Sequence, residues 1–558
     1  MSIKWLAAAT MYCMALSTAG AATPNARLDQ VVQSFAHSQN FFGSVLVAKG
    51  GNILLEKGYG AANREWNVLN TPCTVFRLGS LTKQFTAAAV LLLAEDGKLD
   101  LDDYVVKHLH DAPPAWHAIT IRHLLTHTSG LPNFTSLPNY GDMKLSTRRP
   151  QDVLVLVRDL PLEFAPGEKF QYSNSGYTLL GLLIEKISGR SWQDFLQSRI
   201  FSPLKMRDSG VDSNKVILAR RAAGYACDGR DCENAGFIDM SIPYAAGALY
   251  STTGDLLRWH TALYNKRLLK PESLRIMTTA FKDGSGFGLF SGLDKRGPRL
   301  SHGGAIEGFS TYAVHYPVQQ LDVIILSNSE GFPAEAMALR LAAVANGEPV
   351  VMNGERRAMS PTPAILDKHV GRYAGENHQL WIKRQGDHLL ARQDGRPWLA
   401  IAAESNANYF YREIDEQLRF KTNAQGSVVA AIWHRSDGDT DMLRLPEQLP
   451  DYAKQPIYVR GSMNDWGVQN KMAPKNPHSF EVSIFLAKGR HEFKIGSEDF
   501  KAIDLGGTDR QLTAANGASK LLETEGDNLH MNVPKDQTYV FTLDASVPTA
   551  PTISVQTK

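Results

Sequence analysis

The sequence predicts an α+β domain followed by two all-β domains. In the first zone, residues 23–348, strand-like segments lie at both ends and a helix-rich stretch lies between them. That order favours one sheet built from the two ends of the zone and covered by helices. The second and third zones, residues 349–447 and 448–558, have almost no helical periodicity and alternate short strand-like runs with turns. This pattern is typical of all-β domains.

The elements of the first zone follow from its periodicity. GSVLVAKGGNILLEKGYG, residues 43–60, predicts two strands joined by a Gly-Gly turn. Residues 309–317 and 321–328 are the expected closing strands. Between them, apolar residues recur with the helical period in residues 81–96, 119–126, 151–159, 175–188 and 191–200. The proline-containing stretch at residues 445–456 is the expected linker between the second and third zones.

Residues 1–22 have the pattern of a secretory signal peptide. Lys4 precedes an apolar segment, residues 5–16, which is too short to span a bilayer. Small residues at 17–22 follow, and we expect cleavage after Ala21 or Ala22. No later segment has about 18 uninterrupted apolar residues, the length that a membrane span needs. We therefore expect an exported protein, periplasmic or secreted, that is soluble and has no membrane span after cleavage.

The charge of the chain argues against a nucleic-acid partner. The formal net charge is +2 and the pI is about 8.2. Neither value reaches the strongly basic range of nucleic-acid-binding domains, and no basic cluster stands out along the sequence. We expect a small-molecule substrate instead.

Three cysteines remain after the expected cleavage. Cys227 and Cys232, in CDGRDC, could close a small disulfide loop in an oxidising compartment. Their spacing is not that of a zinc site, and no second pair exists. Cys73 is then left over, and we expect it to be a buried apolar residue rather than a nucleophile.

Ser80 and Lys83 stand three residues apart in FRLGSLTKQF, at the start of an apolar helical segment. Residues i and i+3 share one helix face, so the amine can lie beside the hydroxyl. A deprotonated lysine can act as a general base and make the serine a nucleophile. A free lysine titrates near ~10.4, so the site must lower that pKa by about three pH units, roughly 4 kcal/mol. Burial and neighbouring positive charge would do this. The alternative is a solvated serine and lysine on a surface turn.

Two further segments carry residues of the same chemistry. Tyr172 and Asn174 lie in QYSNSG, directly before a predicted helix, and offer a phenol and an amide on one face of an extended segment. His302 is followed by Gly303 and Gly304 before a predicted strand. Such glycines would let a substrate backbone approach the sheet edge closely.

With these three motifs in order, the first zone resembles the class C β-lactamase-like serine hydrolases. That family includes β-lactamases, D-alanyl-D-alanine carboxypeptidases, D-aminopeptidases and some esterases. The resemblance covers about residues 28–345 and extends to KGYGAANRE, LLTHTSGLP, FAPGEKFQYSNSGYTLLG, LLIEKISG, AAGALYSTTGDLLRW and HGGAIEGF. It implies a β-lactamase/transpeptidase-like fold, in which helices flank an antiparallel sheet.

The resemblance implies a role for each motif residue. Ser80 would be the acylated nucleophile, and Lys83 and Tyr172 the proton-transfer pair, with the base left open between them. Asn174 would hold a substrate amide or Lys83. The backbone N–H groups of Ser80 and Ala305 would form the oxyanion hole. No cofactor is implied. His123 and His127, four residues apart, could bind zinc by spacing alone, but the HExxH glutamate is absent and a structural role is expected.

His302 departs from the β-lactamase pattern. Where β-lactamases carry a lysine that binds a substrate carboxylate, this chain has a histidine, which is only partly charged at neutral pH. Family members with peptidase or esterase activity often carry histidine there. The leading expectation is therefore a hydrolase of small amides or esters, above all D-amino-acid-containing peptides. The alternatives are a carboxylesterase, a class C-type β-lactamase and a penicillin-binding sensor with little turnover.

The two C-terminal zones resemble accessory modules. Residues 349–447 are similar to the small β-barrel domains found behind such hydrolase domains. Residues 448–558 resemble the early-set, glycogen-binding-like β-sandwich modules of starch-active enzymes. That resemblance implies a glycan partner held on a platform of Trp466, Lys494 and Phe500, where aromatic faces stack on sugar rings. The alternative is that the tryptophan packs structurally and binds nothing.

Overall fold

The computed structural model describes residues 24–38, 41–228, 231–375, 378–393, 398–412, 414, 416–435, 438–446, 452, 454–500, 502–507, 519–524, 526–546 and 551–558. The expected signal peptide, residues 1–22, lies outside the described residues, as does part of the expected linker at 445–456. The chain forms two compact units, Met1–Arg444 and Leu445–Lys558. Within the described part of the chain, no helix is both long and apolar enough to cross a membrane.

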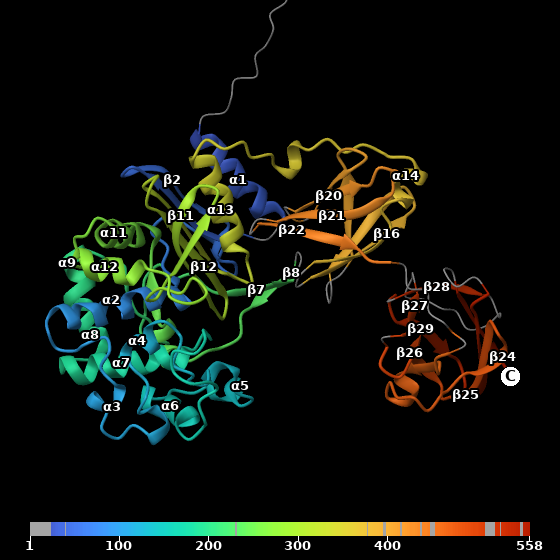
Figure 1. Ribbon diagram of the computed structural model, residues 1–558, viewed down its shortest axis with the longest axis horizontal. Helices are drawn as coiled ribbons and strands as arrows, with labels where there is room; N and C mark the ends of the chain where they lie inside the picture. Colours follow the sequence, from blue (N-terminus) through green and yellow to red (C-terminus); the bar gives the residue numbers. More distant parts are fainter. Residues whose placement is uncertain are drawn as a thin grey trace, which may run out of the picture. The chain divides into compact units, whose positions relative to one another are not determined.

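The first unit contains a six-stranded antiparallel sheet, which confirms the α+β class (Figure 1). The strand order is β10-β11-β12-β13-β1-β2, so N-terminal β1 pairs with β13 from the far end of the zone. The predicted strands at 43–60, 309–317 and 321–328 all belong to this sheet. The bounds are β1 (Gly43–Lys49), β2 (Asn52–Tyr59), β10 (Phe290–Asp294), β11 (Gly297–Ile306), β12 (Phe309–Tyr316) and β13 (Leu321–Ser327).

Helices cover the sheet, as predicted. Helices α1 (Pro24–Ser38) and α13 (Ala334–Ala345) lie side by side and share one apolar cluster with it. A second and larger cluster contains α2 (Thr82–Glu95), in which every residue from 82 to 93 is buried. A helix that is apolar all round belongs in a protein interior. Figure 1 shows α2 among the helices that form this layer.

The other predicted helices are present with small changes of bounds. They are α4 (Ile121–Leu125), α6 (Pro150–Arg158), α7 (Asn174–Ser188) and α8 (Trp192–Leu196). Helix α7 ends at Gly189, whose φ of +69° is a left-handed conformation that suits glycine. Further helices are α3 (Val105–His108), α5 (Tyr140–Met143), α9 (Ser202–Leu204), α10 (Tyr244–Gly247), α11 (Thr253–Tyr264) and α12 (Pro271–Thr278).

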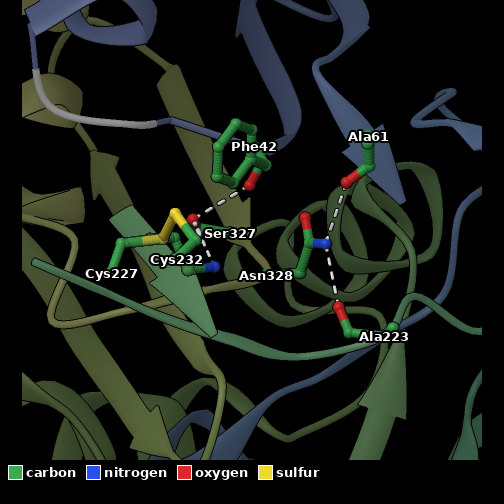
Figure 2. Close-up of a disulfide and its surroundings, with 8 residues drawn as sticks. Phe42, Ala61, Ala223, Cys227, Cys232, Ser327 and Asn328 are labelled. Atoms are coloured by element: carbon green, nitrogen blue, oxygen red, sulfur yellow. Dashed lines mark hydrogen bonds between the residues drawn. A yellow bond between two sulfur atoms is a disulfide. The ribbon is translucent and has the colours of Figure 1, made fainter. Parts of the chain in front are cut away.

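A disulfide joins Cys227 and Cys232 at the hairpin of β7 (Tyr225–Asp228) and β8 (Asp231–Asn234). Near it, the Asn328 side chain donates to the carbonyl oxygens of Ala61 and Ala223 (Figure 2). These bonds fix the chain where it leaves β13. The third cysteine, Cys73, is exposed, so the prediction of a buried apolar residue is wrong. Short strands complete this region: β3 (Ala61–Asn63), β4 (Val68–Leu69), β5 (Phe76–Arg77), β6 (Gly210–Val211), β9 (Leu249–Ser251) and β14 (Ser329–Glu330).

The remaining strands of the first unit form a closed antiparallel barrel, in sequence order from β15 to β22. Its interior is a separate apolar cluster that includes Tyr373, Phe420 and Trp433. The helix α14 (Pro363–Asp367) precedes it. The strands are β15 (Gly371–Ala374), β16 (Gln379–Gln385), β17 (His388–Gln393), β18 (Leu399–Ala403), β19 (Asn408–Tyr411), β20 (Gln417–Thr422), β21 (Val428–Arg435) and β22 (Gly438–Arg444).

The second unit is all-β, as the sequence predicts. Its strands pack around an apolar cluster of its own, in which Phe493 and Phe541 meet edge to face. The strands are β23 (Tyr458–Gly461), β24 (Ala473–Asn476), β25 (Ser479–Leu486), β26 (Gly489–Gly496), β27 (Asp504–Gly507), β28 (Lys520–Thr524), β29 (Leu529–Val533), β30 (Gln537–Asp544) and β31 (Thr552–Thr557).

Candidate active site

Ser80 lies in a single turn, Gly79–Leu81, that leads into α2. Gly79 has a φ of +55°, which side chains rarely adopt. A Cβ at Gly79 would lie only 2.9 Å from the backbone nitrogen of Ala305 in β11. Glycine therefore lets the turn that carries Ser80 press against Ala305. The two backbone segments predicted to form the oxyanion hole are thereby brought together.

Lys83 is fully buried one turn further along α2. Its Nζ lies 2.9 Å from Ser80 Oγ, 2.8 Å from Asn174 Oδ1 and 2.8 Å from the carbonyl oxygen of Ala246. The ring centroid of Tyr172 is 4.8 Å from the same nitrogen. The structure thus gathers the predicted serine, lysine, tyrosine and asparagine around one amine.

Burial lowers the pKa of Lys83 well below its usual 10.5. A neutral amine has two hydrogens and one lone pair. The amide oxygen of Asn174 and the carbonyl oxygen of Ala246 can only accept hydrogen bonds, so they take the two hydrogens. The lone pair is then left for the hydroxyl proton of Ser80. This arrangement suits a general base beside a nucleophile.

Tyr172 lies in the loop before α7, with its ring over the lysine amine. Burial raises the pKa of the Tyr172 phenol above its usual 10, although a hydrogen bond with the Ser80 hydroxyl acts in the opposite direction. The phenol therefore keeps its proton at neutral pH. These pKa directions suit Lys83 to accept a proton and Tyr172 to donate one, and the assignment of the base stays a prediction.

His127 packs against Tyr172, a contact that the sequence did not predict. Its ring stacks on the Tyr172 ring at a centroid distance of 4.3 Å, and its Nδ1 accepts a hydrogen bond from the backbone N–H of Ser173 at 3.1 Å. Burial lowers the pKa of His127 well below 6.5, so its ring is neutral. The Nδ1 of His123 faces the backbone nitrogen of Thr120 at 3.2 Å. Each histidine of the i, i+4 pair thus has a structural partner of its own.

Asn174 is the first residue of α7, because Ser173 is still extended. Its Nδ2 donates to Thr135 Oγ1 at 3.2 Å, and this bond turns Oδ1 toward Lys83. Of the two roles predicted for Asn174, contact with a substrate amide or with Lys83, the structure contains the second.

His302 is 3% exposed, and its ring centroid lies 6.3 Å from that of Tyr172 and 5.3 Å from that of Phe290. Its Nδ1 is 2.5 Å from the carbonyl oxygen of Gly303, which can only accept, so Nδ1 carries the hydrogen. Burial, followed by the nearby Lys83, lowers the pKa of His302 to about 4. The sequence suggested a partly charged histidine; in the structure it is neutral at neutral pH.

The outer edge of β11 is open beside Ala305. Strand β10 pairs with β11 only as far as Ser301, and residues 302–306 pair with β12 alone. Ala305 is exposed there, at the edge where the sequence predicts the approach of substrate, and that approach stays a prediction. Gly304 also has a packing role that the sequence did not predict. A Cβ at Gly304 would lie 2.0 Å from the carbonyl oxygen of Leu78, so this glycine is needed for packing against the turn of Ser80.

Glu307 follows the same strand and had no assigned role from the sequence. Its carboxylate forms an ion pair with Lys144 at 2.7 Å, and both side chains are largely buried. The pair joins the turn after β11 to the residue that follows α5. We assign it a structural role.

The three residues of the predicted glycan platform lie close together in the second unit, around Arg460. The Arg460 guanidinium donates to the backbone carbonyl oxygen of Trp466 and lies 4.2 Å from the ring centroid of Phe500. The Lys494 amine is 5.7 Å from that centroid and forms an ion pair with Asp504. The side chains of Trp466 and Phe500 are both half-buried.

Comparisons with known proteins show what the chain is similar to. The family model Beta-lactamase matches residues 28–346. Penicillin-binding protein 4* of Bacillus subtilis (strain 168) is 28% identical over 445 residues, which cover 75% of this chain and 98% of that protein. The octameric penicillin-binding protein homologue from Pyrococcus abyssi is 26% identical, with a TM-score of 0.54, and the match covers 75% of this chain and 99% of that one. The D-amino acid amidase from Ochrobactrum anthropi SV3, solved with D-phenylalanine, is 25% identical with a TM-score of 0.52, over 57% of this chain and 99% of that one.

The fold and the site together define a serine hydrolase. A serine at the start of a buried helix, a buried lysine beside it and an open strand edge opposite are the parts such an enzyme needs. The family match covers more than half of the 558 residues. The chain belongs to the beta-lactamase family.

Proposed function

We propose that this enzyme hydrolyses small amides of D-amino acids through an acyl-serine intermediate on Ser80. Ser80 Oγ attacks the substrate carbonyl carbon, and its proton passes to Lys83 Nζ at 2.9 Å. The backbone N–H groups of Ser80 and Ala305 stabilise the negative oxygen of the tetrahedral intermediate. The C–N bond then breaks, the amine leaves with a proton from Tyr172, and Lys83 returns its proton to the phenol. Water finally cleaves the acyl ester by the same path in reverse.

The neutral state of His302 supports an amide of an amino acid over a substrate held by its carboxylate. A neutral imidazole offers no positive charge to a carboxylate, and the amine of Lys83 is enclosed by three oxygen atoms. Among solved relatives, the D-amino acid amidase matches the chain at 25% identity. Within the D-amino-acid class, we therefore favour an amidase or aminopeptidase over a carboxypeptidase.

The alternatives differ in which substrate is turned over. A carboxylesterase would use the same nucleophile and would not require a D-configured centre. A β-lactamase or a penicillin-binding sensor would need a cation for the carboxylate of the drug, and His302 does not supply one.

A matched substrate panel tests the proposal. The purified enzyme is assayed with D- and L-phenylalanine amides, a D-Ala-D-Ala peptide, short nitrophenyl esters and a chromogenic cephalosporin, with Ser80→Ala as control. We expect the highest kcat/KM for the D-amide and none in Ser80→Ala. Turnover of esters alone would indicate a carboxylesterase. Acylation by penicillin followed by slow hydrolysis of the acyl-enzyme would indicate a penicillin-binding sensor.

We also propose export to the periplasm or outside the cell, on the basis of the signal pattern at residues 1–22. N-terminal sequencing of the protein recovered from a periplasmic or culture fraction should begin after Ala21 or Ala22. Recovery of chain that still begins at Met1, from the cytoplasm only, would reject export.

A second proposal concerns the C-terminal unit, which we suggest binds glycans. The contacts of Arg460 support it: its guanidinium lies 4.2 Å from the ring centroid of Phe500 and donates to the backbone carbonyl oxygen of Trp466. The Lys494 amine lies 5.7 Å from the same Phe500 centroid, so donors stand beside an aromatic face of the kind that stacks on sugar rings. The full chain should be retained on insoluble starch, and Trp466→Ala should be released earlier. Equal retention of both forms would reject the platform.

A further inference from the structure

One of the three oxygen atoms around Lys83 comes from the backbone of a short helix, α10. Lys83 Nζ donates to the carbonyl oxygen of Ala246 at 2.8 Å, and both groups are buried. The neighbouring carbonyl of Ala245 accepts a hydrogen bond from Thr86 Oγ1 in α2 at 2.7 Å. The position of α10 therefore decides where the lysine amine is held.

Helix α10 is fixed at its first residue by a phenol. Tyr244 Oη donates to Glu185 Oε1 at 2.7 Å, and the same carboxylate accepts from the backbone N–H of Trp192 at 2.9 Å. Burial and this carboxylate raise the pKa of Tyr244, so the phenol stays protonated and donates. Tyr244 has a φ of +37°, an unfavourable conformation that surrounding contacts must hold.

Tyr244 and Ala245 of α10 pack closely against Gly181 of α7. A Cβ on Gly181 would lie 2.4 Å from the Tyr244 ring and 2.5 Å from Ala245 Cβ. Helix α7 thus supplies Asn174, one acceptor for Lys83, at its first turn, and Glu185 at its last turns. Through Tyr244, Glu185 controls a second acceptor.

We infer that Glu185 is a positioning residue for Lys83. Its carboxylate holds Tyr244, Tyr244 sets α10, and α10 presents the Ala246 carbonyl to the lysine amine. This inference rests on the proposed role of Lys83 as the base. Weakening the anchor would remove an acceptor that stabilises the ammonium form more than the neutral amine, so the pKa of Lys83 would fall further. The amine would also be less well aligned with Ser80.

The test measures the rate of Ser80 labelling by a fluorophosphonate as a function of pH, because this reaction does not depend on the natural substrate. Glu185→Ala and Tyr244→Phe should slow labelling by about ten- to a hundredfold. In both variants, the fall of the labelling rate on the acidic side of the pH profile should move to lower pH by about half a unit or more, because the pKa of Lys83 is lower. Glu185→Gln retains an acceptor oxygen and should stay within about threefold of wild type.

Matched variants separate this role from a structural one. Tyr316→Phe also removes a phenol–carboxylate bond, to Asp294 at 2.9 Å, but Tyr316 lies on β12 in a different apolar cluster from that of α2. This variant should leave the pH profile unchanged. With a structural role alone, Glu185→Ala would instead reduce only the fraction of protein that is folded and becomes labelled. If the folded protein then labels at the wild-type rate and with the wild-type pH dependence, the inference is wrong. If Lys83→Ala labels at the wild-type rate, the proposed function itself fails. If Lys83→Ala labels slowly but Tyr244→Phe labels at the wild-type rate, the positioning role of Glu185 is rejected and the proposed function stands.

Discussion

Ser80 Oγ lies 2.9 Å from the Nζ of Lys83, an amine with no exposed surface. Water cannot stabilise the ammonium form there, and two acceptors that cannot donate orient the amine hydrogens. The apolar residues of α2 therefore have a chemical consequence besides packing. By lowering the pKa of Lys83, they favour the neutral amine, whose lone pair can receive the serine proton.

The leaving group should decide how much Tyr172 matters. The raised pKa of the phenol makes it a proton donor to the departing amine. Tyr172→Phe should lower kcat/KM for a D-amino acid amide by about 10²–10⁴-fold, the usual contribution of a general acid. The nitrophenolate of a nitrophenyl ester leaves without being protonated, so Tyr172→Phe should lower kcat/KM for that ester much less. Tyr59→Phe, which removes the phenol that bonds to Asp29, is the control. Equal losses on both substrates would show that Tyr172 does not act as the acid.

Gly79 should be essential for the oxyanion hole. A methyl group in Gly79→Ala would strain a φ of +55° and press on Ala305. We expect kcat to fall by about 10²–10³-fold, as when one oxyanion donor is lost. Gly97→Ala is a matched control, since Gly97 has a φ of +71° but no heavy atom within 4 Å of the added Cβ. Kinetics and thermal melting of both variants separate strain from damage to the site, and similar activities in the two variants would contradict the proposed role.

The pH dependence of KM should show no titration of His302 near neutral pH. Burial lowers the pKa of His302 to about 4, so its ring becomes charged only as the pH falls through that value. KM for a neutral substrate should therefore be flat from about pH 5 to 8, without the inflection near 6.5 of an ordinary histidine. An inflection near 6.5 that disappears in His302→Gln would mean that the ring is charged during binding.

Asp322 should stabilise the sheet through its charge. Burial alone would raise the pKa of Asp322, but hydrogen bonds from His260 and His315, each at 2.8 Å, outweigh it and hold the pKa far below 3.8. A depressed folded-state pKa gives stabilisation that is present above the unfolded pKa and is lost as the pH falls toward the folded one. Asp322→Asn should lower the free energy of unfolding at neutral pH by about 3 kcal/mol.

Urea unfolding followed by tryptophan fluorescence measures that change. The difference between Asp322→Asn and wild type should shrink below about pH 4, where the unfolded carboxyl becomes protonated. Asp387→Asn removes an exposed aspartate beside His388 and should leave the urea midpoint unchanged. A difference that stays constant with pH would assign the effect to packing instead of charge.

The sequence predicted the side chains of the site because they stand in short local motifs. The pair of Ser80 and Lys83 follows from helical spacing, and Tyr172 and Asn174 precede a helix that the periodicity identifies. The Ala246 carbonyl was not predicted, because a backbone acceptor has no residue signature. His127 stands in the quoted segment LLTHTSGLP, but only the fold shows that its ring stacks on Tyr172.

The sheet and the two β domains were also predictable, since alternation and turn residues are local signals. Cys73 was placed wrongly because composition alone favours burial of a free cysteine, whereas the loop that carries it lies at the surface. The ion pair of Lys144 and Glu307 joins positions 163 residues apart, and no local pattern reports such a contact.

The most direct measurement is intact-protein mass spectrometry of fluorophosphonate labelling across pH, with Ser80→Ala and Lys83→Arg beside wild type. Wild type should gain one adduct, on Ser80, at neutral pH, and the rate should fall as the pH drops through the lowered pKa of Lys83. Ser80→Ala should gain none. Lys83→Arg, which cannot become neutral, should label at least about 10²-fold more slowly. An adduct in Ser80→Ala, or a wild-type rate in Lys83→Arg, would contradict activation of Ser80 by a neutral Lys83.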